Sequence, residues 1–232
     1  MPEPLPALPA DTCSWAHSFA LLKRHGFRPQ RILDVGANHG AWTRAAIEYF
    51  PDATYTLVEP QDHLRVHVQD LRERGCALRW VTAGVSDRPG RLPFTIAPND
   101  VSSNFGLSPD EARRLGYTQV EVEIITIDDL VARDGGAVPE MVKIDAEGFD
   151  LQALRGGRSL FGRTEVFYVE AAVCATRVEN TMAAVISTMT EAGYRMIDIT
   201  DLNRSPRHGV LWLCELVFLR EGSPLLAAAS SY

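Results

Sequence analysis

The sequence predicts an α/β fold in which one mostly parallel sheet carries helices on both faces. Short apolar segments typical of strands alternate along the chain with segments of helical periodicity, which favours right-handed βαβ units. A glycine-containing turn follows the first such strand, as it does at ligand sites of open α/β sheets. The 232 residues, of which 46% are hydrophobic, suffice for one large domain with a full core.

We expect an N-terminal extension, residues 1–30, to precede a main domain of residues 31–232. Four prolines among the first ten residues favour an extended arm. Asp11 or Thr12 could then cap a helix that runs to about His25, and Gly26 would end it.

From residue 31 onward the expected strands and helices alternate. The expected strands are residues 31–36, 54–60, 77–86, 141–147, 165–171, 194–200 and 213–221. The expected helices are residues 41–50, 63–75, 149–161 and 179–193.

One region, from about Arg91 to Ile127, interrupts this alternation. It holds two strand-like segments, residues 91–98 and 120–127, which predict an inserted β-hairpin. The polar loop between them is long for a compact domain, and long loops are often functional. This loop could cover a ligand or line a substrate pocket with its short polar residues Ser102, Ser103 and Asn104, beside Phe105.

Composition argues against several classes of protein. A net charge of −7 and a pI near 5.4 disfavour a broad nucleic-acid interface, which needs clustered basic residues. The four cysteines form no CxxC pair, so zinc is disfavoured and reduced thiols are expected. The N-terminus lacks the features of a signal peptide and no apolar run is long enough to span a bilayer, so we expect a cytoplasmic protein.

The turn after the first expected strand, within "RILDVGANHGAWT", limits the kind of ligand. Gly36 and Gly40 allow a tight turn and a close backbone approach, and Asn38 tolerates a left-handed conformation. The GxGxxG pattern of dinucleotide sites and the Walker pattern of phosphate loops are both missing. Asp34 would repel a phosphate and suits a ligand with an ammonium group.

The second expected strand ends in "LVEP". Glu59 is placed to accept hydrogen bonds from both hydroxyls of a ribose, as the acid after the second strand does in dinucleotide sites. A ligand with an ammonium group, a ribose and no phosphate matches S-adenosylmethionine.

These residues carry a family resemblance. "DVGANHGAWT", "VEP", "ITIDDL" and "VKIDAEGFDLQALRGG" resemble the motifs of the FkbM family of S-adenosylmethionine-dependent methyltransferases, over roughly Arg31 to Gly157. "ELVFLR" is similar to the family's last strand. The chain departs mildly at Ala146 and Asp150, where the family often has Val and Glu. The resemblance implies a class I methyltransferase Rossmann-like fold with a seven-stranded sheet, and O-methylation of hydroxyls on sugars or natural products.

The resemblance also implies a set of cofactor-binding residues. Asp34, Gly36, Ala37, Asn38 and Gly40 would contact the methionine part, with Thr43 at the end of the same motif. Glu59 would hold the ribose, Gly84 and Val85 would lie by the adenine, and Asp145 would lie near the methyl group.

A hydroxyl acceptor benefits from a general base or from a metal that lowers its pKa. Asp145, Glu147 and His208 are the catalytic candidates, and Glu170 could face the same cleft. His208 is a candidate because histidine titrates near neutral pH. Asp145, Glu147 and Glu170 could also hold a divalent cation, but no dedicated metal pattern is present, so no metal ligands are assigned.

Three alternatives stay open. A nucleic-acid methyltransferase that modifies amines would usually show an Asn/Asp-Pro-Pro-aromatic motif where this chain reads Asp145-Ala-Glu-Gly. One that modifies a carbon of a base would need a nucleophilic cysteine, and Cys174 has no base-binding context. A non-catalytic module that binds S-adenosylmethionine and serves a partner subunit fits the same motifs. An NAD-linked enzyme is disfavoured by the glycine spacing. The expected partner is a small-molecule acceptor, without nucleic acid or membrane.

Overall fold

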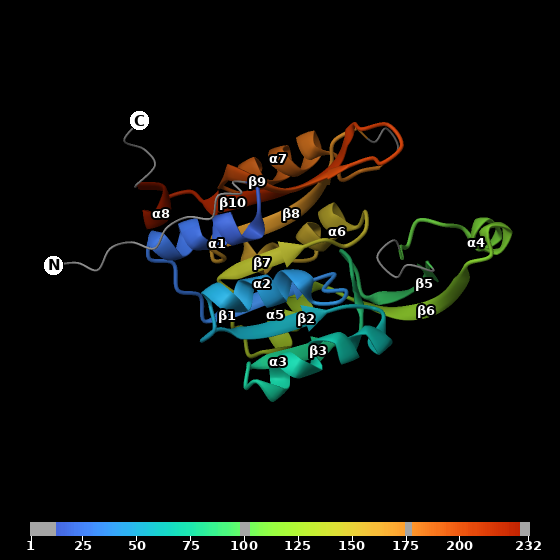
Figure 1. Cartoon of the computed structure of the whole chain (residues 1–232), viewed down its shortest axis with the longest axis horizontal. Helices are drawn as coiled ribbons and strands as arrows, with labels where there is room; N and C mark the ends of the chain where they lie inside the picture. The colour runs from blue at the N-terminus through green and yellow to red at the C-terminus, as the bar shows by residue number, and fades with distance from the viewer. Residues whose placement is uncertain (1–12, 98–102, 175–177, 228–232) are drawn as a thin grey trace.

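A computed structural model describes residues 13–97, 103–174 and 178–227. Its centre is a seven-stranded sheet with the order β3-β2-β1-β7-β8-β10-β9 (Figure 1). The strands are β1 Arg31–Val35, β2 Thr54–Val58, β3 Leu78–Val81, β7 Met141–Ile144, β8 Val166–Ala172, β9 Tyr194–Arg204 and β10 Leu211–Arg220. The neighbours from β3 to β8 pair in parallel, and β10 pairs antiparallel with both β8 and β9. The prediction of a seven-stranded, mostly parallel sheet is therefore confirmed.

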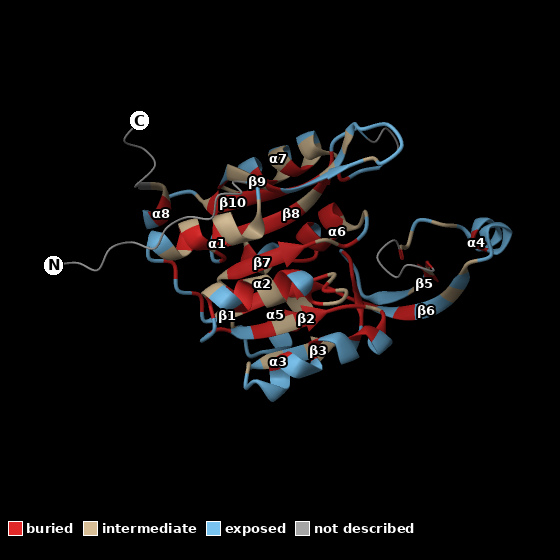
Figure 2. Ribbon diagram, in the orientation of Figure 1, coloured by how far each residue is buried: buried red, intermediate tan, exposed pale blue. Residues whose placement is uncertain are grey.

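Helices cover both faces of this sheet, as predicted. On one face, α1 (Trp15–Arg24), α2 (Ala41–Tyr49) and α3 (Gln69–Glu73) enclose an aromatic-rich core, in which the rings of Phe19 and Tyr168 lie 5.4 Å apart. On the other face, α5 (Ile127–Arg133), α6 (Asp150–Arg155) and α7 (Met182–Glu191) pack on an aliphatic core. Figure 2 shows the central strands buried between these layers. A short helix, α8 (Pro224–Ala227), follows β10.

The inserted region forms a second, three-stranded sheet with the order β4-β6-β5. It consists of β4 (Gly84–Val85), β5 (Gly90–Ile96) and β6 (Thr118–Ile125), and β5 and β6 form the expected antiparallel hairpin. Figure 1 shows this sheet beyond the end of β7, with α4 (Pro109–Leu115) at its tip. The insertion therefore lies beyond the carboxyl ends of the parallel strands, and not beside an edge strand.

Local structure departs from the expectation at several places. α4 lies within the segment expected to be a loop, and a Ser108–Glu111 capping box with Pro109 at its first turn explains its start. α5 was not expected, since Ile127 was assigned to a strand and residues 128–133 to no element, but Thr126 caps it by accepting a hydrogen bond from the Asp129 amide. The segment 63–75 is divided between a 3₁₀ helix, Asp62–Val68, and the short α3, Gln69–Glu73, rather than forming one α-helix.

The first helix begins later than expected. Ser14 caps it by accepting a hydrogen bond from the His17 amide, and Asp11 and Thr12 lie outside the described residues. No helix of the described ranges is both long and apolar enough to cross a membrane.

Candidate active site

A pocket lies at the carboxyl ends of β1, β2 and β7, where the inserted sheet meets the main sheet. Its volume is about 1030 Å³, including its open mouth. The main sheet and its loops supply most of the wall, namely Val35 to His39, Ala41, Trp42, Val58 to Gln61, Lys143, Asp145, Ala146 and Glu147. The rest comes from Trp15, Ala83 to Val85, Phe94, Ser103, Phe105 and Asp201. Open α/β sheets bind their ligands at this edge.

The loop after β1 approaches the pocket through its backbone. Gly36 has a φ of +73°, and a Cβ added there would overlap the carbonyl oxygen of Asp145. The amides of Gly36 and Ala37 both donate to the Val58 carbonyl, at 2.9 and 3.1 Å. Gly40, with a φ of +76°, begins α2, and a Cβ there would overlap the Val68 side chain. Glycine is therefore required twice by close packing.

Unusual backbone conformations gather at this pocket. Among the described residues, the non-glycine positions with positive φ are Asn38 at 47°, Glu147 at 51° and Asp201 at 50°. All three line the pocket, although they come from three distant parts of the chain. Such strained conformations persist where surrounding structure holds them, and they cluster at functional sites.

Glu59 is held in place by hydrogen bonds at the end of β2. One carboxylate oxygen accepts the Asn38 amide at 2.9 Å, and the other accepts the Gln61 amide at 3.0 Å and its side-chain amide at 3.3 Å. Ser103 of the insertion donates to the Gln61 side-chain oxygen at 3.3 Å and accepts the Ala97 amide at 3.0 Å. Burial raises the pKa of Glu59, which is only 4% exposed. The insertion is thus linked to Glu59 through Gln61.

Three predicted cofactor residues lie just outside the pocket wall. Asp34 is fully buried beneath it and accepts a 2.5 Å hydrogen bond from the Thr43 hydroxyl. Burial raises the pKa of Asp34, and the nearby Lys143 ammonium opposes this effect. Gly40 also lies behind the wall, as the start of α2. From this position, Asp34, Gly40 and Thr43 can support the glycine loop, but they do not line the space that a ligand would occupy.

The predicted adenine-side residues form an apolar wall. Gly84 and Val85 are buried in β4, and Phe94 and Phe105 stand beside them with ring centroids 4.8 Å apart. Phe105 also packs on Phe149, with ring centroids 5.0 Å apart. The insertion therefore contributes a flat, aromatic side to the pocket.

Two predicted catalytic residues, Asp145 and Glu147, both line the pocket just after β7. Asp145 accepts a 3.0 Å hydrogen bond from Lys143. Desolvation inside the pocket, followed by repulsion from Asp145 and Asp150, raises the pKa of Glu147 to about 8. Glu147 still has solvent access in the open pocket, so water moderates both effects. A carboxyl with such a pKa can act as a base near neutral pH.

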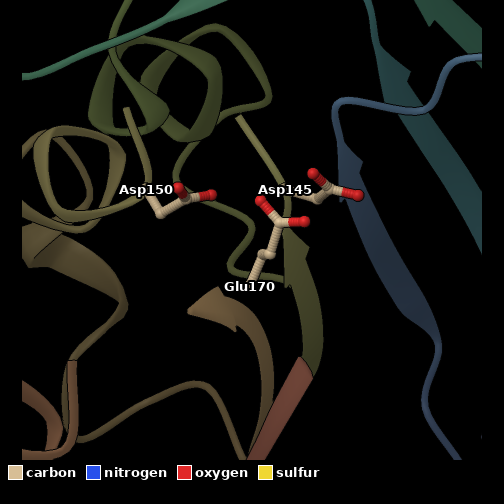
Figure 3. A group of neighbouring side chains, drawn as sticks. All are labelled: Asp145, Asp150 and Glu170. Atoms are coloured by element: carbon tan, nitrogen blue, oxygen red, sulfur yellow. The ribbon is translucent and has the colours of Figure 1, made fainter. Parts of the chain in front are cut away.

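Asp145 also belongs to a cluster of three acids, which we call the acid cluster: Asp145, Asp150 and Glu170. One oxygen of each lies within 4.8 Å of the other two, and Figure 3 shows the three side chains as neighbours. Asp150 accepts from the Ala146 amide at 2.7 Å and from Asn180 at 2.6 Å. Burial and the neighbouring acids raise the pKa of Asp150 to about 7 and that of Glu170 to about 10. The divalent cation considered at Asp145, Glu147 and Glu170 gains no support, since Asp150 rather than Glu147 completes the group of acids among the described residues.

The acid cluster predicts a stability that falls as pH rises. Because the folded state holds a proton on Glu170 that the unfolded chain, with a pKa of 4.5, has lost, folding free energy is lost above that value and up to about pH 10. Glu170→Gln removes this penalty, so its free energy of unfolding should exceed that of the wild type at pH 9, and the advantage should be larger at pH 9 than at pH 6 by at least about 1 kcal/mol. Urea unfolding at pH 6 and pH 9 measures the difference. The exposed Glu121→Gln is the control, and equal pH slopes for wild type and Glu170→Gln would contradict the prediction.

The structure does not bring His208 to the pocket. It lies exposed in the turn between β9 and β10, where its amide donates to the Ser205 hydroxyl. His39 does line the pocket, and its ring lies 4.3 Å from that of His67. The geometry thus favours Glu147 over His208 as a base.

Several wall residues were not expected from the sequence. Lys143 could have been noticed as a lone charged residue in the apolar segment "MVKI", which marks a buried charge with partners. Gln61 follows the "VEP" motif directly. Trp15 and Asp201 have no local signal, because α1 and the end of β9 meet the pocket only in the folded chain.

Comparison with known proteins agrees with this geometry. The model of the methyltransferase FkbM domain matches residues 34–196. The chain is 21% identical over 150 residues to 2-O-methyltransferase NoeI of Sinorhizobium fredii, covering 60% of this chain and 62% of that protein. It is 26% identical over 158 residues to methyltransferase sdnD of Sordaria araneosa, covering 54% and 59%. The match thus spans about three fifths of the length of these relatives.

Among solved structures, the fold is similar to that of precorrin-6y C5,15-methyltransferase from Geobacter metallireducens. The TM-score is 0.50 at 13% identity, and the superposition covers 92% of this chain and 93% of the other. At this identity the likeness concerns the fold alone.

Proposed function

This chain belongs to the FkbM methyltransferase family, and on that basis we propose that it transfers a methyl group from S-adenosylmethionine to a hydroxyl of a small molecule. The observation that carries the proposal is the pocket itself. Glu59, whose carboxylate accepts a backbone hydrogen bond, lines the same pocket as the two carboxyl groups of Asp145 and Glu147. Aromatic rings from the insertion line another side of this pocket.

The residues present fit S-adenosylmethionine by their chemistry. Glu59 accepts from three N–H groups, which leaves one of its roughly four acceptor sites, on Oε2, for a ribose hydroxyl, and Val85 and Phe105 offer an apolar surface to adenine. Asp145 supplies negative charge toward a cationic donor. A phosphate fits poorly, since the charged wall residues are four acids, Glu59, Asp145, Glu147 and Asp201, and one base, Lys143.

The chain's own residues have two tasks in this reaction. S-adenosylmethionine supplies a methyl group activated by its sulfonium. The pocket wall orients the acceptor hydroxyl, and alignment of this kind can be worth ~7–11 kcal/mol of barrier in well-oriented systems. Glu147 accepts the proton that the hydroxyl loses, and Asp145 keeps the negative charge that raises the basicity of Glu147. His208 is left out of this scheme because of its position.

The acceptor class is supported by the charge of the pocket and by the relatives. Excess acid in the wall disfavours nucleotides and nucleic acids as acceptors. One relative is named as a 2-O-methyltransferase, which supports oxygen as the methylated atom. The proposal therefore specifies a small acceptor without phosphate.

Methyl-labelled S-adenosylmethionine with a panel of acceptors tests the proposal. The panel contains polyhydroxylated small molecules, phosphorylated counterparts, and DNA and RNA. We expect label in a base-stable ether on an unphosphorylated member. Label in nucleic acid, or in none of the hydroxyl compounds while the cofactor binds, would contradict it, and the second result would favour a non-catalytic module.

A weaker effect is expected at the insertion. Ser103→Ala removes the hydroxyl that joins the Ala97 amide to Gln61, so Gln61 holds Glu59 less firmly. The affinity for S-adenosylhomocysteine should fall about three- to tenfold, which corresponds to one net hydrogen bond. Calorimetric titration measures it, with the exposed Ser187→Ala as control. Unchanged affinity in Ser103→Ala would refute the link.

A further inference from the structure

Lysine is rare in this chain. Among its 23 basic residues only Lys23 and Lys143 are lysines, and the others are arginines. Lys143 lies on β7 and is 4% exposed, yet it lines the pocket. A buried cation is costly unless it is paired and hydrogen-bonded, so its contacts indicate what it does.

The Lys143 ammonium has two hydrogen-bond acceptors and one further ion-pair partner. Its Nζ donates to an Asp145 carboxylate oxygen at 3.0 Å and to the Gly36 carbonyl at 3.2 Å. It lies 3.7 Å from the Asp34 carboxylate. These partners come from β1, from the glycine loop and from the end of β7. A compact ammonium with rotatable donors fits this arrangement.

The same ammonium is the counter-charge for more than one acid. Asp34 Oδ1 is buried and has no hydrogen-bond partner, so Lys143 is the cation that stabilises it. Glu215 on β10 also interacts electrostatically with Lys143. Within the described residues, the ion pairs of Asp34 and Asp145 are both made with Lys143, so removing the lysine would take away the cation that the two acids share.

This charge balance matters for a donor that loses its charge. S-adenosylmethionine carries one positive charge more than its product, S-adenosylhomocysteine. A pocket with uncompensated acids binds the cationic donor strongly in the ground state, and this attraction weakens as the charge leaves the sulfur. Binding of that kind lowers the dissociation constant of the donor without speeding the reaction.

We infer that Lys143 is a positioning residue that fixes the Asp145 carboxylate and offsets its charge toward the sulfonium of the donor. The inference rests on the proposed function. Lys143 is then expected to change the affinity for S-adenosylmethionine relative to that for S-adenosylhomocysteine. It is not expected to set the affinity for the parts that the two molecules share.

The test is the ratio of two dissociation constants, that of S-adenosylhomocysteine divided by that of S-adenosylmethionine. Both are measured by calorimetry on the full chain. In Lys143→Met the ratio should rise about tenfold, because one nearby positive charge is removed. In Lys143→Arg, which keeps the charge, it should stay within about threefold of the wild type. Lys23→Met on α1 is the control and should leave it unchanged.

The ratio is insensitive to a general loosening of the pocket, because such damage weakens both ligands alike. A folded Lys143→Met protein with the wild-type ratio would overturn the inference. If Lys143→Met does not fold, Asp145→Asn decides: a ratio about tenfold below the wild type supports the inference, and an unchanged ratio overturns it. Failure of the wild type to bind either ligand would instead refute the proposed function.

Discussion

Gly36→Ala is expected to destabilise the protein by more than ~3 kcal/mol and to abolish cofactor binding. The alanine must adopt a φ of +73°, and its Cβ would overlap the carbonyl oxygen of Asp145. That oxygen belongs to the backbone and cannot rotate away, so β1 and β7 must separate where they pair. Urea unfolding and titration with S-adenosylhomocysteine measure the two losses.

Gly116→Ala is a matched control for this prediction. Gly116 has the same φ of +73°, at the end of α4, but no atom lies within 4 Å of a Cβ added there. Its replacement carries only the cost of a left-handed residue, ~1–2 kcal/mol. Equal losses for the two variants would show that close packing at Gly36 is unimportant.

Glu147→Gln is expected to lower kcat by about 10²- to 10³-fold. Glutamine preserves the shape of the side chain but cannot accept a proton. Affinity for S-adenosylhomocysteine should change by less than about threefold, since Glu147 is proposed to serve the acceptor. The exposed Glu48→Gln on α2 is the control. A larger loss in His208→Ala than in Glu147→Gln would reverse the assignment of the base.

The pH dependence gives an independent check of the same residue. Because the pKa of Glu147 is raised to about 8, its carboxylate form increases as pH rises through this value. The ratio kcat/KM should therefore rise from pH 6 through pH 8 and level off about one pH unit above the pKa in the wild type. In Glu147→Gln, the remaining kcat/KM should not rise over this pH range. A flat wild-type profile would exclude Glu147 as the base.

The sequence predicted those parts of the site that local patterns determine. The glycine loop and Glu59 follow strands that alternate with helices, so their place at the sheet edge could be derived. The long polar loop that contains Phe105 was considered as a cover or wall of the pocket, and Ser103 and Phe105 do line it. α5 was missed because its start, Thr126, follows a β-branched run that favours a strand.

The remaining parts depend on contacts between distant segments. Asp150 and Glu170 meet only because β7 and β8 are neighbours in the sheet. The raised pKa values of these groups come from burial and mutual repulsion, which spacing along the chain does not encode. Trp15 reaches the pocket through the packing of α1 on the sheet. These three features could therefore be identified only from the tertiary structure.

The central claim is that this pocket binds S-adenosylmethionine through Glu59. Titration of the wild type and of Glu59→Ala with S-adenosylhomocysteine in a calorimeter tests it most directly, with NADH as the comparison ligand. We expect binding of S-adenosylhomocysteine to the wild type, at least about tenfold weaker binding to Glu59→Ala, and none of NADH. A folded wild type that binds neither S-adenosylhomocysteine nor S-adenosylmethionine would contradict the claim.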